Sequence, residues 1–194
     1  MTPHKFFPKV NYTPKELEYL HSEKTFDIWN KICDYIKHHR SKNIVDIGCA
    51  TGAINHFLQG YTYNYYGIDK SPLLIEEANN TWKSQENIKF EFGDWNTTVT
   101  ECECDCLLLL GVLPYAITEY GYTNNDTPWD MYNRLMKKYN PKQVIIRETV
   151  SVQDGELLDI PTVDLKPFLE IATNVEYITV NTILGDKVLI HVTR

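Results

Sequence analysis

The feature that most constrains this chain is a short apolar run that ends in a turn of small residues. Residues 43–47 read Asn-Ile-Val-Asp-Ile, and residues 48–52 follow as Gly-Cys-Ala-Thr-Gly. The run predicts a buried strand, and the glycines predict a tight reversal, because glycine adopts positive φ and lets a ligand approach the backbone. Residues 53–58 can form a helix with a positive dipole end. The stretch therefore predicts a binding turn for the carboxylate or ribose of a nucleotide-like ligand.

Segments typical of strands and helices alternate along the rest of the chain. We expect helices over residues 13–21, 25–39 and 53–58, from Ser71-Pro72 onward, and over 127–139 and 164–173. We expect strands at residues 43–47, 63–69, 87–92, 104–110, 143–147, 175–183 and 187–193. This order predicts an α/β fold with an open, doubly wound, mostly parallel sheet and a C-terminal antiparallel hairpin. Segment 93–103 is short for a crossover helix.

Composition narrows the classes of partner. The chain has 194 residues, enough for one domain, and 19 basic against 26 acidic residues give a net charge of −7. The densest basic cluster is residues 37–42, and it is more typical of a helix C-terminus, where cations complement the helix dipole, than of a nucleic-acid-binding surface. Long nucleic acid is therefore not an expected partner. The first residues lack the apolar core of a signal peptide, and no apolar run is long enough to span a membrane. Together with an odd count of five cysteines, this predicts a cytoplasmic protein with reduced thiols. Nothing indicates its oligomeric state.

The turn differs from the dinucleotide-binding fingerprint, because Ala50 stands where the second of three glycines belongs. The form Asp-x-Gly-x-Ala-x-Gly over residues 46–52 resembles motif I of the class I S-adenosylmethionine-dependent methyltransferases. The resemblance covers residues 43–193 and implies a seven-stranded Rossmann-like fold, S-adenosyl-L-methionine as the cofactor, and methyl transfer. Residues 1–40 then form an arm and helices over the acceptor side of a single domain, residues 1–194. The alternative at this point is any buried strand followed by a glycine turn.

Three acidic residues end three successive predicted strands, where ligands of open α/β sheets bind. The resemblance implies that Asp69, in Gly67-Ile68-Asp69, is the motif II acid that accepts hydrogen bonds from the ribose hydroxyls. It implies that Asp94 binds the adenine amino group, that Trp95 stacks on the ring, and that Asp46 faces the methionine end of the cofactor. The alternatives are a helix cap for Asp69, a role that Ser71 already fills, and a surface Asp94 beside a core Trp95.

The expected cofactor site also includes neighbours of these acids and residues of the turn. Gly111 follows the fourth strand, where a missing side chain lets the backbone approach the cofactor. The full set predicted to bind the cofactor is Asp46, Gly48, Cys49, Ala50, Gly52, Asp69, Lys70, Asp94, Trp95 and Gly111.

The residues that act on the acceptor are less defined by the sequence. Leu113-Pro114-Tyr115 lies where the family's motif IV faces the methyl group, but it only echoes the Asn-Pro-Pro-Tyr form. Tyr115 is a candidate for lining the acceptor site or for a base, and Glu148 for holding a cationic acceptor or orienting an amine. Methyl transfer is an in-line displacement at an activated carbon, so positioning can supply much of the rate. Further polar candidates, each with a surface or structural alternative, are His21, His56, Glu119 and Arg147.

Two other patterns suggest sites. Cys102, Cys104 and Cys106 would share one strand face if the strand began that early, but no second ligand pair exists, so we expect free thiols and no metal. Segment 111–126 is long enough for a lid, and with the N-terminal arm it is our candidate for acceptor selection. Tyrosines that could form an aromatic cage for an amine are Tyr12, Tyr19, Tyr115, Tyr120 and Tyr122.

We therefore expect a methyltransferase that uses S-adenosyl-L-methionine and acts on the nitrogen or oxygen of a small-molecule acceptor. One alternative is a sensor or partner subunit that binds the cofactor or its demethylated product without turnover. Another is a methyltransferase that acts on protein or RNA, which the acidic net charge disfavours.

Overall fold

The strands form one seven-stranded sheet in the computed structural model, which describes residues 23–95, 102–116, 127–149, 163–178 and 187–194. The sheet order is β3-β2-β1-β4-β5-β7-β6. The strands are β1 Asn43–Ile47, β2 Asn64–Asp69, β3 Ile88–Phe92, β4 Cys106–Leu110, β5 Gln143–Thr149, β6 Asn174–Ile178 and β7 Lys187–Thr193. β1 to β5 are mutually parallel, and β7 lies antiparallel between β5 and β6. The predicted α/β fold with its closing antiparallel pair is confirmed.

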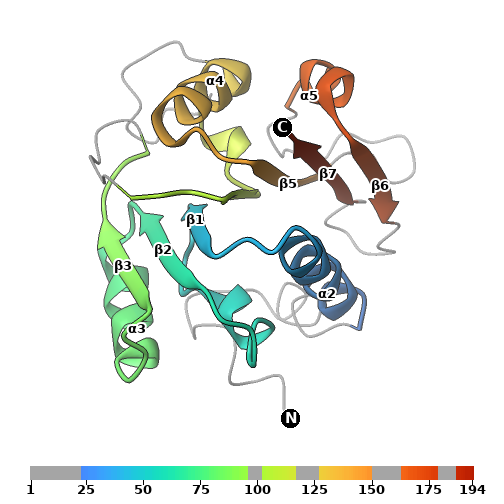
Figure 1. Ribbon diagram of the computed structural model, residues 1–194. Coiled ribbons are helices and arrows are strands. Elements are labelled where there is room, and N and C mark those ends of the chain that lie inside the picture. Colours follow the sequence, from blue (N-terminus) through green and yellow to red (C-terminus); the bar gives the residue numbers. More distant parts are fainter. Residues whose placement is uncertain (1–22, 96–101, 117–126, 150–162, 179–186) are drawn as a thin grey trace.

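Helices cover both faces of this sheet (Figure 1). α4 and α5 lie on one face, and α2 and α3 lie on the other. The α-helices are α2 Glu23–His38, α3 Pro72–Trp82, α4 Pro128–Tyr139 and α5 Lys166–Ile171, and the 3-10 turns are η2 Ala53–His56 and η3 Leu113–Ala116. None of the helices in the described ranges combines the length and apolar character that crossing a bilayer requires.

Two helix starts follow directly from their sequences. The Ser71 hydroxyl accepts a hydrogen bond from the Leu74 N–H at 3.4 Å, and Pro72 occupies the first turn of α3, where it needs no N–H partner. Thr127 and Asp130 cap α4 reciprocally, as a capping box does. Both starts were predicted.

Other elements differ from prediction. Residues 53–58 were expected to form a helix, but only the four-residue 3-10 turn η2 forms, because Gly52 enters it in the left-handed region and the Asn55 side chain donates back to the Gly52 carbonyl at 2.9 Å. The dipole expected of a longer helix is therefore missing. The predicted helix at residues 13–21 and the crossover within 93–103 fall wholly or partly outside the described residues, as does most of the hairpin loop.

β4 is buried on both faces, as its unbroken apolar run indicates. Leu107 and Leu109 pack into the core beneath α4 and α5, and Cys106 and Leu108 pack into the core beneath α2 and α3. A fully buried leucine contributes roughly 1.5–3 kcal/mol, so this strand anchors both layers. The strand begins at Cys106, and Cys104 packs in the opposite core from Cys106, so the expected single face of cysteines does not form. No group of metal-ligating residues occurs in the described part of the chain.

A chain of buried polar groups joins the segment after α2 to the sheet, at the end of the strands remote from the glycine turn. The His191 ring nitrogen Nε2 lies 2.7 Å from the Gln143 side-chain oxygen, and the Gln143 amide donates to the Ser41 hydroxyl at 2.7 Å. Burial, together with the smaller effects of the charges of His39 and His38, lowers the pKa of His191 to about 4. The ring is therefore neutral in the fold at ordinary pH.

This neutral histidine predicts acid sensitivity. The pKa of His191 is about 4 in the folded state and 6.5 as a free side chain, so the unfolded state binds more protons between these values. Its contribution to stability is complete above pH 6.5 and declines as the pH falls toward 4. We expect the stability advantage of the wild type over His191→Gln to shrink between pH 7 and pH 5 in urea unfolding. An advantage independent of pH contradicts the assignment.

Candidate functional site

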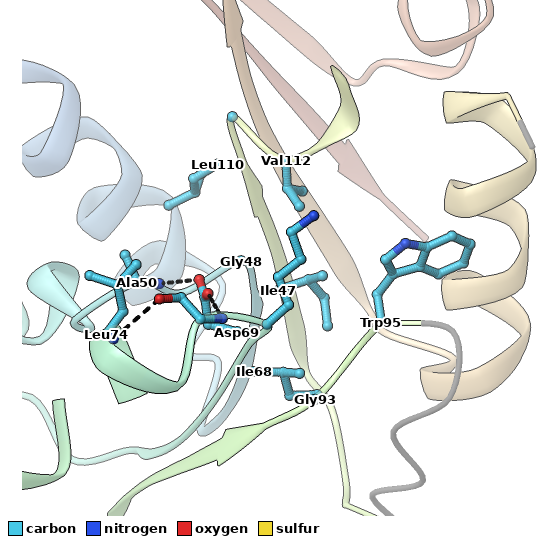
Figure 2. A pocket seen from close by; sticks show the side chains of 13 residues that line it. Ile47, Gly48, Ala50, Ile68, Asp69, Leu74, Gly93, Trp95, Leu110 and Val112 are labelled. Carbon is cyan, nitrogen blue, oxygen red and sulfur yellow. Dashed lines mark hydrogen bonds between the residues drawn. The ribbon is translucent and has the colours of Figure 1, made fainter. Parts of the chain in front are cut away.

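The carboxyl ends of β1, β2, β3 and β4 surround a cavity of about 420 Å³ (Figure 2). β1 lies between β2 and β4, so the strand order reverses here, which is where open α/β sheets bind ligands. A cavity of this volume accommodates one small molecule. It is lined by Ile47, Gly48, Ala50, Ile68, Asp69, Lys70, Ser71, Leu74, Gly93, Trp95, Leu110, Gly111 and Val112.

The turn after β1 forms one wall of the cavity. Gly48 and Gly52 have φ values of +70° and +69°, and Ala50 also lies in the left-handed region at +48°. The N–H groups of Gly48 and Cys49 both donate to the Ile68 carbonyl, at 2.8 and 3.1 Å, and so tie the turn to β2. Ala50 in this conformation costs roughly 1–2 kcal/mol, which the surrounding hydrogen bonds must offset.

Asp69 fixes the turn from the β2 side. Its Oδ2 accepts a hydrogen bond from the Ala50 N–H at 2.9 Å, and its Oδ1 accepts one from the Ser71 N–H at 2.8 Å (Figure 2). The carboxylate is therefore held in one orientation while it lines the cavity. Each oxygen has a further lone pair, so both can still accept hydrogen bonds from a ligand.

The segment after β3 forms the opposite side of the cavity. The Gly93 N–H donates to the Asp69 carbonyl at 3.0 Å, so this segment continues the line of β3 past the end of β2. Trp95 lies across the cavity from Ala50 and Leu74, against α4 (Figure 2). The Trp95 side chain is only 4% exposed, so it belongs mainly to the core and borders the cavity at its edge. Asp94 is half-buried and does not line the cavity.

Three of the residues predicted to bind the cofactor lie behind this wall. Asp46 is 3% exposed, and the Tyr65 hydroxyl donates to its Oδ2 at 2.6 Å. Cys49 packs against Gly67, where an added Cβ would lie 2.7 Å from its sulfur, and Gly52 packs similarly against Phe90. None of the three lines the cavity, so Cys49 and Gly52 shape the turn through packing and backbone conformation.

Asp46 has an unusual electrostatic environment. Burial raises its pKa to about 7, the Tyr65 hydrogen bond acts against that rise, Asp69 adds to it, and Arg147 again opposes it. Its Oδ1 is buried and accepts no hydrogen bond from the residues that the structure describes. A buried carboxyl oxygen in this state costs free energy unless a ligand or water satisfies it.

The end of β4 closes the cavity with small and apolar residues. Leu110, Gly111 and Val112 line it, and the Gly111 N–H donates to the Arg147 carbonyl at 2.7 Å. η3 follows and contains Tyr115, whose side chain lies outside the described structure, as do His21 and Glu119.

Glu148 lies in the core beside this wall. It is 3% exposed, and its Oε1 accepts a hydrogen bond from the Leu113 N–H at 3.1 Å. Burial raises its pKa to about 7, against the effects of the Leu113 hydrogen bond and of nearby Arg147 and Lys187. Glu148 does not line the cavity, and it holds the start of η3 in place. His56, another polar candidate, packs against the Trp82 ring at 4.4 Å.

The structure thus brings six of the ten predicted cofactor-binding residues to one cavity. These are Gly48, Ala50, Asp69, Lys70, Trp95 and Gly111. Ser71 and Leu74 were not predicted to line the site, although their place directly after Asp69 at the start of a helix was a usable signal. The apolar wall was not predicted either, because an apolar strand end has the same pattern whether it meets core or ligand. This wall consists of Ile47, Ile68, Leu110 and Val112.

Comparison with protein families identifies the class. A family model described as a methyltransferase domain matches residues 38–161, more than half of the chain, and the chain belongs to this family. The cavity fits the cofactor of this family, because it combines the glycine turn with the oriented carboxylate of Asp69 at the end of β2. The protein is an S-adenosylmethionine-dependent methyltransferase. No curated protein matches the sequence.

Solved structures support the fold. N-methyltransferase NodS from Bradyrhizobium japonicum WM9 with S-adenosyl-L-homocysteine has a TM-score of 0.72 at 16% identity, covering 94% of this chain and 93% of its own. Magnesium protoporphyrin IX methyltransferase (ChlM) from Synechocystis PCC 6803, also with that ligand, has a TM-score of 0.72 at 11% sequence identity, and the match covers 98% of this chain and 92% of its own. The [4+2]-cyclase SpnF has a TM-score of 0.64 at 10% identity, and the match covers 85% of this chain and 81% of its own. At these identities, the similarity establishes architecture only.

The first test of this site removes the charge of Asp69. We expect Asp69→Asn to weaken the binding of S-adenosyl-L-homocysteine by about 1.5–3 kcal/mol, because the charge is lost and one oxygen remains to accept the two backbone N–H groups of Ala50 and Ser71. Isothermal titration calorimetry measures the change.

Asp105 offers a matched control. Its Oδ2 also accepts two backbone hydrogen bonds, from the N–H groups of Lys42 and Asn43 at 3.0 Å each, but it lies at the opposite end of the strands. Asp105→Asn should lower the melting temperature and leave ligand affinity unchanged. Equal losses of affinity in both variants would mean that Asp69 acts only through stability.

Glu148 yields a prediction about pH. Its pKa is raised to about 7 in the fold from 4.5, so the folded state binds more protons between these values and loses stability as the pH rises through them. Glu148→Gln keeps an acceptor for the Leu113 N–H without the charge. In urea unfolding, we expect the free energy of unfolding of the variant to rise relative to that of the wild type by on the order of 2–3 kcal/mol between pH 5 and pH 8. A constant difference across this range would show that Glu148 is ionised throughout.

Proposed function

We propose that this methyltransferase acts on a nitrogen or oxygen atom of a small-molecule acceptor. The observation that carries the proposal is the character of the cavity. Among the described residues, its walls are mainly apolar and small, and Lys70 is the one basic residue that lines it. An enzyme for long nucleic acid gathers several cations around the mouth of its site to meet phosphates. The cavity therefore suits one small cofactor, and its lining does not favour a long nucleic acid as the acceptor.

The residues around the cavity suggest how the cofactor is held. Asp69 is the proposed acceptor for the ribose hydroxyls, because its carboxylate is already oriented by the Ala50 and Ser71 N–H groups. Ile68, Leu74 and the edge of Trp95 supply apolar surface for the adenine ring. Asp94 remains a candidate for the adenine amino group.

Positioning is the main contribution that we assign to the protein. S-adenosyl-L-methionine, when bound, supplies a methyl carbon activated by the adjacent sulfonium. Gly111 and Val112 form a wall without polar side chains, which excludes water and leaves room for an acceptor atom. Glu148 supports that wall through the Leu113 N–H, which makes it a positioning residue in this proposal. Tyr115 remains a candidate for lining the acceptor site.

The alternative is a protein that binds the cofactor without methyl transfer. One observation favours this alternative: a [4+2]-cyclase shares this architecture, so the fold is compatible with more than one reaction. The residues that line the cavity would serve either role. Turnover separates the two possibilities.

We expect incubation with S-adenosyl-L-methionine and a panel of small amines, phenols and carboxylic acids to give S-adenosyl-L-homocysteine and a methylated product. Mass spectrometry detects both products, and the reaction without acceptor is the control. Tight binding of the cofactor with no turnover over the whole panel would favour the non-catalytic alternative. Turnover confined to a protein or an RNA would contradict a small acceptor.

A further inference from the structure

Arg147 lies against the wall of the cavity at the end of β4. Its Nη2 donates to the Leu110 carbonyl at 3.2 Å, and a Cβ added to Gly111 would lie 3.0 Å from the same nitrogen. Leu110 and Gly111 both line the cavity. The guanidinium therefore contacts the wall formed by Leu110 and Gly111, and Arg147 itself does not line the cavity as the described residues form it.

In the described structure, the charge of Arg147 acts on carboxyl groups only beyond ion-pair distance, where it opposes the rise in the pKa of Asp46 and of Glu148. A guanidinium has five N–H donors, and the described residues show one hydrogen bond from Arg147. The guanidinium carbon also lies 5.7 Å from the centre of the Trp29 ring, within the range of a cation–π contact. Within the described ranges, no carboxylate lies within ion-pairing distance of Arg147. A half-buried arginine held in this way retains donors for an anion.

Glu148 and Asp46, the two acids whose pKa the charge of Arg147 affects, accept hydrogen bonds from other residues. Glu148 follows Arg147 on β5 and therefore points to the opposite face of the sheet, where it accepts the Leu113 N–H. Asp46 accepts the Tyr65 hydroxyl. The charge that adjoins the β4 wall is therefore positive, which does not favour the sequence-based hypothesis that Glu148 receives a cationic acceptor.

We propose that Arg147 binds a carboxylate group of a ligand beside Gly111. This inference rests on the proposed function, because the carboxylate belongs either to the amino-acid part of the cofactor or to the acceptor. A guanidinium recognises a carboxylate through two parallel hydrogen bonds, and the contact of Arg147 with Leu110 and Trp29 preorganises it for that geometry. The two sources differ in which ligand loses affinity when the charge is removed.

The test uses binding, so it does not depend on turnover. In the first titration, the protein and Arg147→Met bind S-adenosyl-L-homocysteine or 5′-methylthioadenosine, which lacks the amino-acid carboxylate. In the second titration, protein saturated with S-adenosyl-L-homocysteine binds benzoate or the neutral benzamide. We expect the variant to lose about 10- to 100-fold in affinity for one carboxylate ligand and to retain its affinity for the matched neutral one.

A loss confined to S-adenosyl-L-homocysteine assigns the carboxylate to the cofactor, and a loss confined to benzoate assigns it to the acceptor. Arg147→Lys should recover part of the affinity, because it keeps the charge and lacks the two-pronged geometry. Arg194→Met is the control, since Arg194 bonds to Asn140 at the remote end of β5. Unchanged affinity of Arg147→Met in both titrations overturns the inference, whereas the proposed methyl transfer is tested separately by turnover.

Discussion

The site depends on one carboxylate that bridges two backbone N–H groups. Asp69 accepts hydrogen bonds from Ala50, in the turn after β1, and from Ser71, at the start of α3. The bond to Ala50 adds to those that Gly48 and Cys49 donate to Ile68 between β1 and β2, and it helps to offset the strain of a left-handed Ala50. The same carboxylate lines the cavity, so a ligand meets an acceptor whose orientation is already fixed. Such preorganisation lowers the free energy that binding must spend on ordering.

β5 divides its two charged residues between the faces of the sheet. Glu148 points into the core beneath α4 and α5, where it holds the Leu113 N–H, and Arg147 points toward α2 and Trp29. Each residue supports a different part of the wall at the end of β4. Alternation along a strand therefore lets consecutive residues serve structure on one side and the cavity on the other.

The opposite end of the sheet is closed by polar bonds between chain segments. Asp105 accepts the N–H groups of Lys42 and Asn43, and Gln143 links Ser41 to His191. These residues hold β1, β4, β5 and β7 together at the end of the strands remote from Asp69. The cavity can therefore remain open at the carboxyl end without loss of order in the sheet.

The sequence by itself determined the order of strands and helices, the turn at residues 48–52 and the role of Asp69 as the acid that ends β2, because these depend on local periodicity and on side chains next to one another in the chain. Only the tertiary structure decided which predicted residues share a cavity. Asp46 and Cys49 lie behind its wall, whereas Leu74 reaches it. Packing across strands that are distant in sequence sets these positions, and the same packing brings Arg147 to Gly111.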